Sequence, residues 1–152
     1  MSSSLHPYRY WIEDDKYLFR TPSGVLYVAY FLDLSSLAEN LFTFIFDRVS
    51  MGDKGVIDTQ VCDTVCTILA SFFKEHINSI LIVCDSADGR EKARMRLFNA
   101  WFDRIAPEGL IKVDRTGRTS SYELFVSILL CQDNPAKEQL KALLEDYCNM
   151  VT

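Results

Sequence analysis

The residues best suited to chemistry cluster in one short stretch that joins an expected strand to an expected helix. An apolar run at 80–83 ends in an acidic turn, and a helical pattern with spaced arginines follows. The charged residues that stand out there are Asp85, Asp88, Arg90, Arg94 and Arg96. Arginines four residues apart share one face of a helix and can hold an anion through paired hydrogen bonds. The stretch therefore predicts a binding site for an anionic ligand or a protein partner.

A purely structural interpretation of the same stretch stays open. Asp85 and Asp88 suit the positive end of a helix dipole and can cap its free N–H groups. The arginines would then be solvated, or paired with nearby acids such as Glu91. Trp101 and Phe102 fall on the apolar stripe of this helix and are expected in the core.

Other catalytic and metal-binding patterns are weak, so no catalytic residue is assigned. The segment 50–58 has two glycines and a lysine ahead of a helix, but it lacks the spacing of a P-loop or a Rossmann motif. Neither His6 nor His76 has an evident Ser or Cys partner, and neither is expected to act as a general base. Cys62 and Cys66 are four apart on an expected helix, and no second ligand pair follows. The five cysteines are therefore expected to be reduced thiols, and Cys62 and Cys66 are expected to be core residues and not a metal site.

The composition is that of one globular domain spanning 1–152, with 1–6 expected to be flexible. The formal net charge of −5 disfavours nucleic acid as a partner. The chain has no apolar run near the roughly 20 residues of a membrane span, and no pattern typical of a signal peptide. A cytoplasmic location without membrane association is expected.

The hydrophobic pattern predicts an α+β fold in the order β-β-β-β-α-β-α-β-β-α. The expected strands cover 8–12, 17–20, 25–32, 41–48, 80–84, 110–113 and 122–131, and the expected helices cover 58–76, 89–105 and the segment from 134 onward. The segment 33–40 is left as a loop or one helical turn, and 114–120 is expected to be a polar loop. The helix at 58–76 is long enough to cross over between two parallel strands, and the other strands are expected to pair antiparallel. One mixed, mainly antiparallel sheet results.

Two resemblances accompany these patterns. The stretch "CDSADGREKARMRLFNAWF" at 84–102 resembles a small family of uncharacterised bacterial proteins, which implies a fold grouping and no chemistry. The element order from residue 17 onward is similar to that of the GCN5-related N-acetyltransferases, without their two N-terminal helices. That resemblance implies an acyl-CoA-dependent N-acyltransferase whose pyrophosphate site lies around Lys54, Gly55 and Val56. The arginine or glutamine and the second small residue of that family's loop are absent at the expected spacing.

The leading hypothesis is therefore a bacterial binding domain for a protein partner or a small anionic ligand, without a cofactor. The alternative is an N-acyltransferase that uses acyl-CoA, and whether the chain is an enzyme stays open. A third hypothesis is a homodimer formed through the edge strand that carries Arg9 and Trp11.

Overall fold

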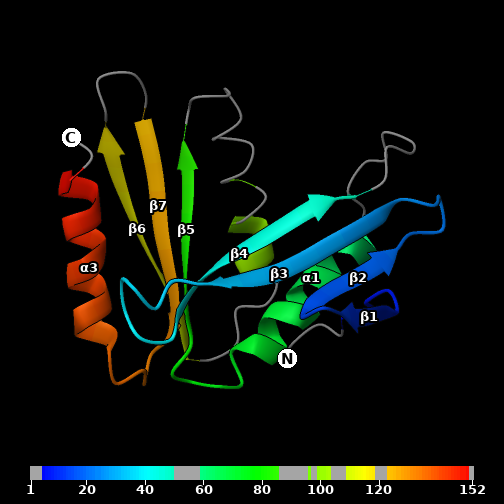
Figure 1. Ribbon diagram of the computed structural model, residues 1–152, viewed down its shortest axis with the longest axis horizontal. Coiled ribbons are helices and arrows are strands. Elements are labelled where there is room, and N and C mark those ends of the chain that lie inside the picture. Colours follow the sequence, from blue (N-terminus) through cyan, green and yellow to red (C-terminus); the bar gives the residue numbers. More distant parts are fainter. Residues whose placement is uncertain are drawn as a thin grey trace.

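Seven strands form one mixed sheet in the computed structural model (Figure 1). The structure describes residues 5–49, 59–85, 96, 99–103, 109–118 and 123–150. The strands are β1 (Tyr10–Glu13), β2 (Lys16–Arg20), β3 (Leu26–Asp33), β4 (Leu41–Arg48), β5 (Ser79–Asp85), β6 (Leu110–Arg118) and β7 (Glu123–Cys131). The helices are α1 (Thr59–Phe72) and α3 (Lys137–Met150), and residues 99–103 are also helical. The α+β class and the element order agree with the sequence prediction.

The strands lie side by side in the order β1-β2-β3-β4-β5-β7-β6. Among the residues that the structure describes, only β4 and β5 pair in parallel, and α1 supplies the crossover between them. The first hairpin turns at Asp14 and Asp15, which have φ angles of 51° and 63°. Short polar side chains tolerate this left-handed conformation, and a two-residue turn of that hand matches the twist of paired strands. The predicted parallel pair is confirmed.

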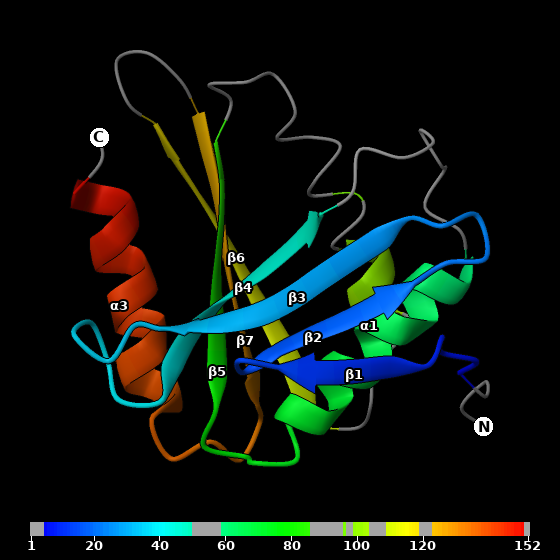
Figure 2. The ribbon, with the colours of Figure 1, turned by 45° about the vertical axis from the view of Figure 1, so that its right-hand side comes forward.

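Helices cover both faces of the sheet, because the central strands are apolar on both sides (Figure 2). Along β5, Ile80 and Ile82 join the cluster beneath α1, whereas Leu81 joins the cluster beneath α3. This alternation follows from the two-residue period of a strand. Trp101 is only 3% exposed and packs edge-on against Phe46, with ring centroids 5.3 Å apart. The expectation that Trp101 belongs to the core is confirmed.

Two predicted boundaries are wrong for identifiable reasons. The helix expected to reach His76 ends at Phe72, where the Asn78 side-chain amide donates a 3.1 Å hydrogen bond to the Phe72 carbonyl. Part of the polar loop expected at 114–120 belongs to β6, which pairs with β7 as far as Arg118. Polar side chains are tolerated there because β6 is an edge strand. Asp114 accepts hydrogen bonds from Lys112 and Ser127, both at 2.5 Å.

The segment 33–40, expected to be a loop or one helical turn, begins with Asp33, the last residue of β3. The rest of the segment forms turns and no helix, and it ends at Asn40 with a φ of 58°. The chain ahead of β1 is attached to α1. The backbone N–H of His6 donates to Asp63 at 2.9 Å, and that of Tyr8 donates to Thr64 at 2.7 Å.

Candidate functional site

The predicted arginine site is only partly covered by the structure. Asp85 is the last residue of β5 and pairs with Leu124 of β7. Arg96 is helical and exposed. The other residues assigned to this site, Asp88, Arg90 and Arg94, lie outside the described residues, and so do Lys54, Gly55 and Val56 of the predicted pyrophosphate loop. These assignments stay predictions.

The sheet itself divides between β4 and β5 (Figures 1 and 2). Their parallel ladder contains only two residue pairs, Leu41 with Ser79 and Phe42 with Ile80. Beyond these pairs the two strands diverge towards their carboxyl ends, while β4 stays paired with β3 and β5 stays paired with β7. Ligands of α/β sheets commonly bind at the carboxyl ends of diverging parallel strands. The edges of β4 and β5 beyond their last ladder pair are therefore one candidate region for a ligand.

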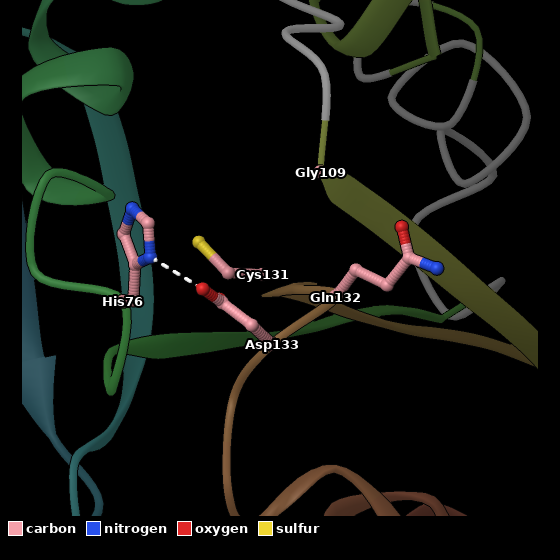
Figure 3. A pocket seen from close by; sticks show the side chains of 5 residues that line it. All are labelled: His76, Gly109, Cys131, Gln132 and Asp133. Atoms are coloured by element: carbon pink, nitrogen blue, oxygen red, sulfur yellow. Dashed lines mark hydrogen bonds and ion pairs between the residues drawn. The ribbon is translucent and has the colours of Figure 1, made fainter.

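A second site lies near the opposite end of β5, where three side chains with ligand atoms meet (Figure 3). His76 comes from the turn that follows α1, Cys131 is the last residue of β7, and Asp133 lies in the turn that leads to α3. The Asn134 side chain joins the two turns, since its amide donates to the Ile77 carbonyl at 3.3 Å. The crossover helix and the β7–α3 connection are thus held together at this point.

The three side chains border a cavity of about 320 Å³ that Gly109 and Gln132 also line. The Nδ1 atom of His76 lies 2.9 Å from a carboxylate oxygen of Asp133, and these two side chains are 61% and 67% exposed. Cys131 is only 7% exposed. One ligand atom from each of the three residues falls within 4.8 Å of the other two.

The Cys131 thiol is poorly arranged to act as a free nucleophile. Burial, and next the negative charge of Asp133, raise the pKa of Cys131 above its ordinary value, so the reactive thiolate is disfavoured. The thiol donates to the Phe73 carbonyl at 3.7 Å. A Cys–His pair needs a ring nitrogen free to accept the thiol proton. Here Nδ1 contacts Asp133, and the other ring nitrogen points away from Cys131 (Figure 3).

Sequence reasoning missed this group because its members are far apart along the chain. His76 and Asp133 are separated by 57 positions, and no local spacing pairs them. Cys131 ends an apolar strand, so its pattern indicates a core residue, which its burial also fits. The available signal was topological. If β5 and β7 are antiparallel neighbours, the first residue of β5 and the last residue of β7 lie at the same end of these two strands.

Within the part of the chain that the structure describes, no helix is long and apolar enough to cross a membrane. No curated protein and no solved structure matches the sequence. A family model does match, over residues 57–149. This range includes α1, β5 and the group formed by His76, Cys131 and Asp133. Since the match spans well over half of the 152 residues, the chain belongs to a family of unknown function, DUF6169.

Proposed function

We propose that this domain binds an extended anionic ligand of the acyl-CoA type along the edges of β4 and β5, beyond their last ladder pair. The observation that carries the proposal is the short parallel ladder, which stops at Phe42 and Ile80 although both strands continue. Past that point, β4 and β5 have no ladder partner on their facing edges among the described residues. Backbone N–H and C=O groups on such edges favour a ligand that can pair with them.

An acyl-CoA molecule suits these edges chemically. Its pantetheine arm is extended and contains amides, which can bond to strand edges much as an added strand does. Its phosphates need N–H donors or cations, which helix N-termini and arginines supply. The resemblance to the GCN5-related N-acetyltransferases implies this ligand class, and by that resemblance the phosphates would bind near Lys54, Gly55 and Val56. N-acyl transfer is the activity that the same resemblance implies.

Val83 lies on the proposed path of the ligand along β5. It lies in β5 beyond the end of the parallel ladder, and it is 38% exposed, whereas its cross-strand partner Val126 is fully buried. The apolar parts of a ligand that follows β5 would contact this side chain.

Thermal unfolding with three ligands tests the proposal. Acetyl-CoA should raise the melting temperature, because a ligand specific to the folded state stabilises it by mass action. Pantetheine should give a smaller rise, which would show that the arm itself is bound. If ADP raises the melting temperature as much as acetyl-CoA does and pantetheine has no effect, the protein binds the phosphates but not the pantetheine arm. No rise with acetyl-CoA would refute the proposal.

A matched pair of variants locates the site. Val83→Trp places a bulky ring on β5 beyond its last ladder pair with β4, and it should weaken acetyl-CoA binding. Ile12→Trp is the control, since Ile12 is 62% exposed on β1, at the outer edge of the sheet. Equal binding by both variants would place the ligand elsewhere.

A second candidate function is the binding of a protein partner through Arg90, Arg94 and Arg96. The observation that favours it is the exposure of Arg96 on a helical segment of a protein with a net charge of −5. An Arg90→Ala, Arg94→Ala double variant should fold normally but lose partner recovery in pulldowns from the host. Recovery equal to that of the unaltered protein would remove this candidate.

A further inference from the structure

We propose that His76, Cys131 and Asp133 form a binding site for a divalent transition-metal ion such as Zn²⁺. Imidazole nitrogen, thiolate sulfur and carboxylate oxygen are the three ligand types that Zn²⁺ takes from proteins. One such atom from each residue already lies within 4.8 Å of the other two. The site is separate from the facing edges of β4 and β5, so the proposal does not depend on acyl-CoA binding.

Rotation of two side chains can bring the three ligand atoms to the spacing that a metal ion requires. Ligand bonds of about 2.0–2.3 Å in a tetrahedral arrangement put neighbouring ligand atoms about 3.3–3.6 Å apart. The Nδ1 of His76 and the Oδ2 of Asp133 are 2.9 Å apart, slightly closer than this. Both side chains are more than half exposed and can turn without disturbing the core. Cys131 is fixed at the end of a paired strand and would serve as the anchor.

The charges of the group also suit a divalent cation. On binding, the Cys131 sulfur gives up its proton to solvent and donates an electron pair to the metal, so its hydrogen bond to Phe73 is lost. The thiolate and the Asp133 carboxylate then bring two negative charges, and His76 binds as a neutral imidazole. The sum with a divalent ion is zero, which reduces the cost of placing these charges in a partly buried site.

The ligand types select among metals. A soft thiolate beside an imidazole favours Zn²⁺ and similar transition metals, whereas Mg²⁺ and Ca²⁺ prefer oxygen ligands alone. Three protein ligands leave a fourth tetrahedral position, and the cavity of about 320 Å³ has room for a water molecule there. The Gln132 side chain points away from the three ligands in Figure 3, so it does not fill that fourth position.

Cobalt titration of the full chain tests the site, because Co²⁺ reports its ligands by colour. We expect one equivalent to bind and to give a sulfur-to-cobalt charge-transfer band in the near ultraviolet. Excess Zn²⁺ should abolish the band. Absence of the band at saturating Co²⁺ would overturn the proposal.

Single variants assign the ligands. Cys131→Ser should abolish the band, whereas His76→Gln and Asp133→Asn should each lower Co²⁺ affinity by at least about tenfold, as loss of even indirect metal partners does. The matched controls change the same residue types elsewhere and should bind normally: His6→Gln, Cys62→Ser, Cys148→Ser and Asp146→Asn. If Cys131→Ser does not fold, the two exposed variants still decide the question. Undiminished affinity in both, or an equal loss in the controls, would refute the site.

Discussion

Replacing Asn134 should destabilise the protein in two separable steps, because its side chain makes two different hydrogen bonds. The Oδ1 atom accepts a 2.8 Å hydrogen bond from the N–H of Ala136, which caps the start of α3. The amide nitrogen donates to the Ile77 carbonyl at 3.3 Å and links this turn to the one that carries His76. Asn134 is only 4% exposed, so water cannot readily replace either partner.

The magnitudes follow from the two roles. Loss of a helix cap costs about 1 kcal/mol, and loss of one further buried hydrogen bond costs about 1 kcal/mol. Asn134→Ala removes both and should lower the free energy of unfolding by about 2 kcal/mol. Asn134→Ser keeps a capping oxygen but has no amide to reach Ile77, so it should cost about 1 kcal/mol. For a chain of this size, the loss in Asn134→Ala corresponds to a fall of roughly 4–8 °C in melting temperature.

Urea unfolding followed by circular dichroism measures these differences, provided that the dependence on urea has the same slope in all three proteins. If the free energy of unfolding of Asn134→Ala lies within about 0.5 kcal/mol of that of the unaltered protein, the reasoning is refuted, since surface substitutions without a structural role fall in that range. If Asn134→Ser and Asn134→Ala lose the same free energy of unfolding, the helix cap contributes nothing and the hydrogen bond to Ile77 accounts for the whole effect.

Three further predictions concern single residues. Gly24→Ala should cost about 1–2 kcal/mol in urea unfolding, because φ is +90° there and a Cβ meets no atom within 4 Å, so backbone strain is the only cost. Asp15→Gly should raise the free energy of unfolding by about 0.5–1 kcal/mol, because glycine suits the positive φ of the hairpin turn; a loss of stability would contradict the assigned turn. Burial, and then Glu145, raise the pKa of Cys148 above its ordinary 9.0, against the opposing effect of Arg115. Above pH 9.0 the unfolded thiol therefore loses its proton before the folded one, and stability falls as pH rises; Cys148→Ser should reduce this alkaline loss, and an unchanged pH profile would refute it.

Local patterns were enough to predict most of the sheet. Phe44 and Phe46 alternate along β4 with residues of the other face, and this two-residue period identifies a strand. The crossover length of α1 predicted the parallel pairing of β4 with β5. Both inferences depend on residues close together in the chain, where steric period and connection length constrain the structure.

Interactions between distant segments were beyond the reach of these patterns. The residues 114–118 look like a loop because they are polar, yet β7 supplies them with a complete ladder and the Glu145 carboxylate pairs with Arg115. His76 has no partner nearby in sequence, and Asp133 is brought to it only by the sheet order in which β7 lies next to β5. Tertiary pairing therefore decided both the extent of β6 and the composition of the second site.

The two proposed sites lie at opposite ends of β5, and this separation makes their tests independent. The seven residues of β5 span about 20 Å, from the end beside His76 to the end at which β4 has diverged. Substitutions so far apart, with no shared partner, usually act additively. A defect in acetyl-CoA binding caused by Val83→Trp should therefore leave Co²⁺ binding unchanged, and Asp133→Asn should leave acetyl-CoA binding unchanged. Loss of both functions in either variant would mean that β5 transmits a change between its ends, which neither proposal contains.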